Sequence, residues 1–567
     1  MEKKVRRSGF IEGTFFATTA IIIVKILGML YVVPFYKIVG SQGGALYSYA
    51  YNIYLLFLEI SSAGLPNAIS KIISEYDTLG YANTKKRAFN LAKKILLFIS
   101  IVVFLILFVF AEEIGMFIIG DIEGGNTFQD IAFVIRCVAP AVIVVPFLSI
   151  TKGYLQGHKV IAPSSISQVV EQVVRIFVIL TGSYLVLNIL HKSLSLAVGI
   201  AVSGAFFGAL AALITIQLFF KKNSILEEDY KKTKEEEKIR NRDIVKKIIR
   251  YSIPFVIISI VTNIYNFTDQ IIVLRTISKL GYSTTDVEFI ASSIATWSPK
   301  ICMAINALAM GMSVPLIPTI VSAFTKKDKV ELNDKINRSI TLVFFLSVPV
   351  ETGIFSLATP VWTLFYNTNP YGGMILQLAV VSALAANVYM IVSIILQSLN
   401  KYALVYKCAI TGFVCNAVFD IPWMLFFHYV LHQEAFLGSI VSSICGFTIS
   451  SCIGCIGLRR LDKDISFLKS FIWFGKISLC GFIMIIPLLF ARWILPFDVT
   501  TISGAIYTIL ILFVIGAPIY IFVTYKMGLI KDLMGEETWN KIVRKVTFGK
   551  FGKKAWDQEE LKIHKKY

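Results

Sequence analysis

The sequence has few charged residues, and the motifs of several common enzyme classes are missing from it. Asp, Glu, Lys and Arg make up 16% of the chain, whereas hydrophobic residues make up 56%. There is no Gly-rich loop ending in Gly-Lys-Ser or Gly-Lys-Thr, no His-Glu-x-x-His and no Gly-x-Ser-x-Gly. A nucleotide-driven pump needs the first of these and hydrolases use the others. We therefore predict that the chain is not an enzyme and uses no cofactor for covalent chemistry.

About fourteen apolar stretches fill the chain instead, each near the roughly twenty residues that a helix needs to cross a bilayer. Lys and Arg gather in every second connection, and the connections 112–130, 367–374 and 428–436 contain neither. By the positive-inside rule, this alternation predicts a multi-pass protein of the bacterial cytoplasmic membrane with both termini in the cytoplasm. The net charge of +19 is spread over short connections, so we expect membrane lipids and not nucleic acid as its counterpart.

The eight cysteines lie in or beside apolar stretches. In such places Cys acts as a small packing residue, and Cys452-Ile-Gly-Cys455 fits helix packing with small residues better than a metal or redox pair. We therefore predict no disulfides.

Short similar segments at matching positions, which we call echoes, indicate that the chain has two similar halves. Leu155-Gln156 and Leu396-Gln397 each follow the fourth apolar stretch of a half, and Pro66 and Pro315 each lie late in the second. Echoes this short also arise by chance, but repeated halves are the usual construction of secondary transporters. The predicted units are an N-terminal lobe at 1–220, a charged cytoplasmic linker at 221–250, a C-terminal lobe at 251–462, two further helices at 463–525 and a basic cytoplasmic tail at 526–567.

Ionisable residues inside the apolar stretches are functional candidates, because a charge at the centre of a bilayer costs a few kcal/mol or more. Lys25 lies in the first stretch and Lys300 in the eighth. Both side chains can extend to an interface, which is the structural alternative. If they face a shared cavity, they form a receptor for an anionic group such as pyrophosphate. Glu59 in the second stretch is a candidate partner for either lysine or for cavity water.

The fifth stretch carries polar residues at three- and four-residue spacing, which places them on one helical face: Gln168, Glu171, Gln172 and Arg175. We expect Glu171 and Arg175 to neutralise each other as a structural pair. Arg175 is also kept as a candidate for binding an anionic substrate.

Oxygen-bearing side chains in two other stretches suggest a cation. Asn416 and Asp420 are four residues apart, and Asp269 continues a stripe with Asn263 and Asn266. Such oxygens suit a hard ion such as Na⁺ better than a soft metal. The alternative is hydrogen bonding between helices.

Four tyrosines open the second stretch: Tyr47, Tyr49, Tyr51 and Tyr54. Sugar stacking is one interpretation, but we expect an aromatic belt at the membrane interface.

Several motifs together resemble the polysaccharide-biosynthesis branch of the multidrug/oligosaccharidyl-lipid/polysaccharide exporter superfamily, and within it the lipid II flippases of Gram-positive bacteria and their stage V sporulation protein B-like paralogues. The resemblance covers about residues 8–525. It is carried by Lys25-Ile-Leu-Gly28, by Gly64-Leu-Pro66 and above all by Gly153-Tyr-Leu-Gln-Gly157-His158 with Ser167 to Arg175.

The resemblance implies an all-α membrane protein with about fourteen transmembrane helices. Two six-helix lobes form an inverted V around a cationic cavity, and the last two helices form a groove for a lipid tail. Lys25 and Lys300 match basic positions of the family, whereas Tyr31, Leu58 and Glu59 stand where better-known Gram-negative relatives carry arginines. Asp269, Asn416 and Asp420 fit a sodium site of some relatives, with Ser443 as a fourth candidate.

The function that these expectations support is transport of lipid II, an undecaprenyl-pyrophosphate-linked peptidoglycan precursor, from the inner to the outer leaflet by alternating access, with Na⁺ as a candidate coupling ion. The alternatives are a flippase for a capsule, teichoic or spore-cortex precursor, a cation-coupled drug antiporter, and a scaffold for cell-wall synthesis proteins. The expected partners are the lipid-linked oligosaccharide, membrane lipids and cell-wall synthesis proteins. We expect a monomer.

Overall fold

The computed structural model of the chain is helical in all its long elements. It describes residues 10–530 except 63, 121, 123, 159, 223–238, 304, 307–319, 321–323, 325, 327 and 462–464. Pro315, most of the predicted linker and the predicted tail beyond residue 530 lie outside the described residues.

The helices of the first half pack mainly against one another, and we call them the N-terminal group. They are α1 (Phe10–Leu30), α2 (Val32–Ser62), α3 (Leu65–Thr78), α4 (Ala82–Val109), α5 (Ala111–Ile119), α6 (Phe128–Val138), α7 (Ala141–Gly157), α8 (Ala162–Tyr184), η1 (Leu185–Ile189) and α9 (Leu194–Lys222).

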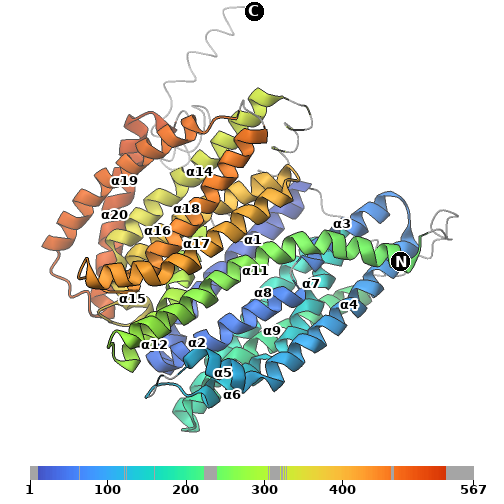
Figure 1. The fold of residues 1–567 in the computed structure, drawn as a ribbon, viewed down its shortest axis with the longest axis horizontal. Coiled ribbons are helices and arrows are strands. Elements are labelled where there is room, and N and C mark those ends of the chain that lie inside the picture. The colour runs from blue at the N-terminus through green and yellow to red at the C-terminus, as the bar shows by residue number, and fades with distance from the viewer. Residues whose placement is uncertain are drawn as a thin grey trace, which may run out of the picture.

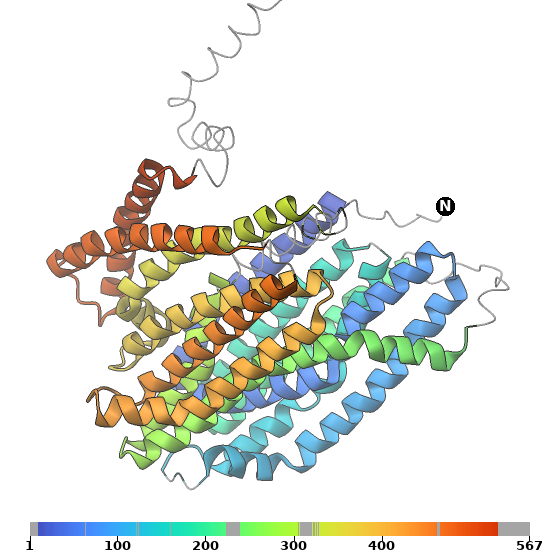
Figure 2. The same ribbon diagram turned by 45° about the horizontal axis from the view of Figure 1, so that its top comes forward.

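The helices of the second half form the C-terminal group, and two more pack on its outer flank (Figure 1). The C-terminal group contains α11 (Asn241–Lys279), α12 (Thr284–Ser292), η2 (Ser293–Trp297), α14 (Lys329–Ser356), α15 (Ala358–Tyr366), α16 (Gly372–Ser398), α17 (Tyr402–Tyr429) and α18 (Phe436–Leu461). The flanking helices are α19 (Leu468–Ile494) and α20 (Ile502–Lys526), which Figure 2 shows at the edge of the molecule.

Eleven segments among the described residues are long and apolar enough to cross a membrane. One of them, Thr19–Ser61, has 43 residues. As one helix it would be about 65 Å long, twice the ~30 Å of hydrocarbon in a bilayer, so it must hold two spans. Gly40 marks the turn between them, because its φ of 68° lies in the left-handed region. The chain is therefore an all-helical, multi-pass membrane protein, as predicted.

Helix α11 belongs to both groups, and it begins at Asn241, inside the stretch predicted as a linker. Its first turns dock on α3 and α4, where Ile244 and Ile248 are fully buried. Lys247 pairs with Glu75 at 2.6 Å. From Asn241 on, the predicted linker is therefore helical, with the buried Ile244 and Ile248 on its packed side.

Candidate functional site

Lys300 lies buried where the two helix groups meet, with 8% of its surface exposed. Its Nζ donates a hydrogen bond to Tyr31 Oη at 2.6 Å. Four aromatic rings surround the same Nζ at 4.8 to 5.4 Å from their centroids, those of Tyr31, Tyr47, Tyr51 and Trp297. Ring faces attract a cation and partly replace its lost water. We call these four residues with Lys300 the lysine cluster.

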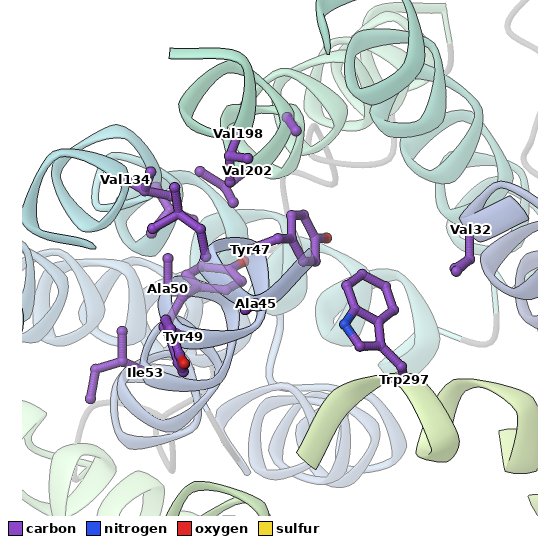
Figure 3. Close-up of a cluster of buried hydrophobic side chains, with 14 of the residues drawn as sticks. Val32, Ala45, Tyr47, Tyr49, Ala50, Ile53, Val134, Val198, Val202 and Trp297 are labelled. Carbon is purple, nitrogen blue, oxygen red and sulfur yellow. The ribbon is translucent and has the colours of Figure 1, made fainter. Parts of the chain in front are cut away.

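The prediction of an interfacial belt at the tyrosines of α2 is therefore wrong. Tyr47, Tyr49 and Tyr54 are almost fully buried. Figure 3 shows Tyr47 facing Trp297, while Tyr49 lies on another side of the same helix. Tyr47 and Trp297 stack at 5.9 Å between ring centroids. These rings are buried because α2 packs on η2, a contact between segments about 250 residues apart that local sequence cannot show.

A second set of charges lies on α7 and α8. Glu171 accepts from Arg175 at 2.8 Å and from Lys152 at 2.9 Å. The predicted pairing of Glu171 with Arg175 is thus confirmed, and its second partner, Lys152, lies in α7. Arg175 is close enough to Lys300 to interact with it electrostatically. Glu171 is thus shared by two cations, and a third cation, Lys300, lies near one of them.

The remaining substrate candidates lie on α1 and α2. Lys25 is half-buried on α1, and no hydrogen bond or ion pair holds it among the described residues. Its helix packs on α8, since a Cβ at Gly28 would lie 3.4 Å from Gln172 Nε2. Glu59 is half-buried in the last turn of α2. Substrate binding by either residue stays a prediction.

Three pairs of polar side chains join the two groups toward the end of the bundle that carries α5 and α12. They are Ser48 with Thr296 at 2.6 Å, Asn52 with Gln270 at 2.8 Å, and Asn126 with Glu288 at 2.9 Å. We call this set the interface seal. Lys300 lies one helical turn beyond Thr296, and on α2 its contacts Tyr47 and Tyr51 each precede a seal residue by one position, so the lysine cluster lies directly beside the seal.

The predicted oxygen cluster is assembled inside the C-terminal group. Asp269 accepts from Asn416 at 2.6 Å and from Ser443 at 2.7 Å. Asp420 is fully buried, and neither of its carboxyl oxygens has a hydrogen-bond partner among the described residues. Two carboxyls, an amide and a hydroxyl supply only hard oxygen ligands, and the orphaned oxygens of Asp420 suit the binding of a cation. Sodium binding itself stays a prediction.

An apolar groove of about 400 Å³ opens between α14, α16, α18 and α19. Phe344, Val388, Thr448 and Phe471 are among its lining residues. The resemblance implied a groove made by the last two helices, whereas α20 contributes nothing to this one.

The comparisons with known proteins agree with this architecture. A family model described as "Polysaccharide biosynthesis protein" matches residues 10–320. The chain belongs to this family. It is 28% identical over 540 residues to the Lipid II flippase MurJ of Bacillus subtilis (strain 168), which covers 93% of this chain and 97% of that protein. Stage V sporulation protein B of the same organism is 23% identical over 324 residues, covering 56% and 59%.

Two solved structures share the fold. One is titled "Lipid II flippase MurJ, inward closed conformation", with a TM-score of 0.65, 16% identity, and coverage of 91% of this chain and 98% of that one. The other is an inward-facing multidrug resistance MATE family transporter of the MOP superfamily, with a TM-score of 0.59, 14% identity, and coverage of 80% and 95%. The chain is thus a MurJ-like membrane transporter and not an enzyme.

Sequence reasoning missed several residues around Lys300. Trp297 precedes Lys300 by three residues, so helical spacing placed both on one face. Tyr31 was noted only as a departure from the family pattern. Glu351 lies inside an apolar stretch, and the cost of burying a charge there could have identified it.

Proposed function

We propose that this protein is a lipid II flippase that moves the precursor from the inner to the outer leaflet by alternating access. Lys300 carries the proposal, because it is a buried cation at the contact between two helix groups of a transporter. Similarity to the Lipid II flippase MurJ of Bacillus subtilis along almost the whole chain supports this substrate. We propose further that both termini lie in the cytoplasm, from the charge of the connections.

A pyrophosphate group suits the lysine cluster chemically. In the present arrangement Lys300 bonds to the hydroxyl of Tyr31, a neutral acceptor. A phosphate oxygen carries negative charge, so it makes a stronger hydrogen bond to an ammonium group than a hydroxyl does. Arg175 and Lys152 add positive potential nearby, since Glu171 balances only one of them. Binding would therefore replace Tyr31 as the acceptor and loosen one contact between the groups.

Transport then requires the interface seal to open. The seal consists of neutral hydrogen bonds and one carboxyl contact, each worth about 0.5 to 3 kcal/mol net. Such contacts are weak enough to exchange in a working cycle. Bound Na⁺ at Asp269, Asn416, Asp420 and Ser443 would supply a second ion whose gradient resets the groups. The apolar groove beside α19 offers room for part of a prenyl chain outside the polar site.

The test is complementation of a strain depleted of its own lipid II flippase. Lys300→Ala should abolish growth while the protein still reaches the membrane, and Lys300→Arg should retain partial function. Lys279→Ala is the matched control, because Lys279 is exposed at the end of α11 and should be replaceable. Normal growth with Lys300→Ala would remove the cationic site from the mechanism.

A flippase for another lipid-linked glycan is the second candidate, favoured by the similarity to stage V sporulation protein B. The two candidates share the pyrophosphate and the prenyl tail, so the lysine cluster serves both. Depletion of the protein in its host, followed by identification of the lipid-linked precursor that accumulates in the inner leaflet, distinguishes them.

A further inference from the structure

Glu351 is an acidic residue inside the C-terminal group that the proposed transport mechanism does not use. It lies on α14, five residues before the helix ends, and only 6% of its surface is exposed. Its Oε1 is buried without a hydrogen-bond partner among the described residues. The ionisable group that interacts with it is the thiol of Cys302, two residues beyond Lys300. A carboxyl group is thus enclosed beside the helix that carries the buried lysine.

No basic group is paired with Glu351 among the residues that the structure describes. Residues 303–325, which follow Cys302 in the sequence, contain no ionisable residue. The ionisable side chains of the neighbouring helices are engaged elsewhere. On α15 and α16, Tyr366 donates to Trp297 O and Tyr389 lies against Phe447. On α19, Lys469 pairs with Asp334, Lys476 lies over Trp473, Cys480 contacts Met527 and Arg492 donates to Ser356 O. On α20, Tyr507 lies against Phe497, Tyr520 donates to Phe345 O and Lys526 lies over Phe522.

Burial decides which form of the carboxyl this conformation holds. An ionised carboxylate without a donor in an apolar environment is so costly that such groups take up a proton instead. The neutral acid avoids this cost and needs no counter-ion. The conformation described here therefore favours the protonated side chain.

The backbone next to Glu351 lacks one of the regular hydrogen bonds of a helix. Pro349 has no N–H, so the carbonyl of Phe345 has no partner within the helix. Tyr520 of α20 donates to that carbonyl at 3.2 Å. A proline inside a helix is a usual site of bending, so the turn that carries Glu351 can change its orientation when the groups move.

We propose that Glu351 is a proton-binding site that is protonated in this closed arrangement and releases its proton to water when the two helix groups separate. One proton is taken up and one is released per cycle, and no bond other than O–H changes. This site is separate from the oxygen cluster at Asp269 and Asp420. The proposal does not rest on the identity of the transported lipid, because it concerns the conformational equilibrium alone.

The sign of the pH dependence follows from linkage. If the closed arrangement binds one more proton than the open one, acid favours the closed arrangement, and the ratio of the two changes up to about tenfold per pH unit. Glu351→Gln keeps the shape of the neutral acid and cannot release a proton. It should hold the closed arrangement at every pH.

Hydrogen exchange of purified wild-type protein without substrate tests this. Peptides of the interface seal around 41–53 and 286–297 should be more protected at pH 5 than at pH 8, after correction for intrinsic exchange rates. Glu351→Gln should remove this difference, and the control Glu113→Gln, at an exposed site on α5, should keep it. Infrared spectra should show a protonated carboxyl band at neutral pH that Glu351→Gln weakens by the contribution of one carboxyl group. An unchanged band, or unchanged pH dependence of exchange in Glu351→Gln, would overturn the proposal, and either result leaves the choice of lipid substrate unaffected.

Discussion

A lysine amine inside a membrane protein needs partners that replace water, and Lys300 has a hydroxyl and four aromatic rings. This enclosure explains how an ammonium group can be buried at the contact between two helix groups without a carboxylate as its ion-pair partner. A carboxylate would neutralise the amine and weaken it as a receptor for an anion. Rings and a neutral hydroxyl stabilise the charge while leaving its field available.

Tyr31→Phe tests the hydroxyl separately from the ring. The variant keeps the ring face near Lys300 but removes the acceptor that its amine bonds at 2.6 Å. A hydrogen bond to a charged group contributes about 1.5 to 3 kcal/mol, so the melting temperature of the purified protein should fall by about 1 to 3 °C. Tyr184→Phe serves as the control, because Tyr184 is exposed and should not alter melting. Equal melting of the two variants would mean that the rings alone hold Lys300.

Asp420 provides a residue-scale test of the oxygen cluster. If Na⁺ binds there, melting in NaCl should occur at higher temperature than in choline chloride of the same concentration, since a ligand of the folded state stabilises it by mass action. Asp420→Asn lowers the negative charge of the cluster with little change in shape, and it should remove the difference between the salts. Identical melting of the unaltered protein in both salts would assign these residues to helix packing alone.

At the scale of elements, the oxygen cluster depends on how closely α17 and α18 approach. Gly412 of α17 faces Gly446 and Ser450 of α18, and an added Cβ would overlap Ser450 Oγ and lie 2.7 Å from Gly446 O. Asn416 lies one turn further along α17 and bonds Ser443 of α18. The glycine therefore sets the spacing at which the amide and the hydroxyl meet.

Gly412→Ala should push these two helices apart. Overpacking of this kind costs about 1 to 3 kcal/mol, so the protein should melt at lower temperature and should lose any dependence on sodium. Gly475→Ala on α19 is the matched control, because its Cβ would meet no atom within 4 Å. There alanine should be neutral or slightly stabilising. The idea fails if Gly412→Ala melts like Gly475→Ala.

Elements were predictable where the signal is local. The length and apolarity of the stretches indicated a multi-pass helical protein, and the four-residue spacing of Glu171 and Arg175 predicted their pair. Asp269 belongs to a polar stripe on one helix, and Asn416 and Asp420 share a face of another, so the approach of these three residues could also be expected. The tyrosines of α2 could not be placed, because tyrosines in an interfacial aromatic belt and tyrosines in a buried helix contact show the same spacing in the sequence. Only the packing of α2 on η2 separates the two.

At the scale of the whole molecule, the interface seal decides whether the two helix groups part. The groups meet through the lysine cluster and the seal, and α11 connects them because its first turns dock on α3 and α4. Rocking of one group on the other would have to break the seal while α11 stays attached at both ends. That places the moving contact at Ser48, Asn52 and Asn126 and their partners.

A disulfide across the seal tests this motion. Ser48 Oγ and Thr296 Oγ1 lie 2.6 Å apart, so Ser48→Cys with Thr296→Cys, in a background without the eight native cysteines, should bring two sulfurs within bonding reach. Oxidation should stop transport, measured as growth of the flippase-depleted strain or as movement of labelled lipid II in vesicles, and reduction should restore it. Each single cysteine variant is the control and should be insensitive to oxidant. Rocking of the groups requires the seal to open, whereas movement of the lipid along a static groove does not, so the two mechanisms predict opposite results for the cross-linked protein. Full transport by that protein would exclude rocking about this interface and leave the static groove as the mechanism.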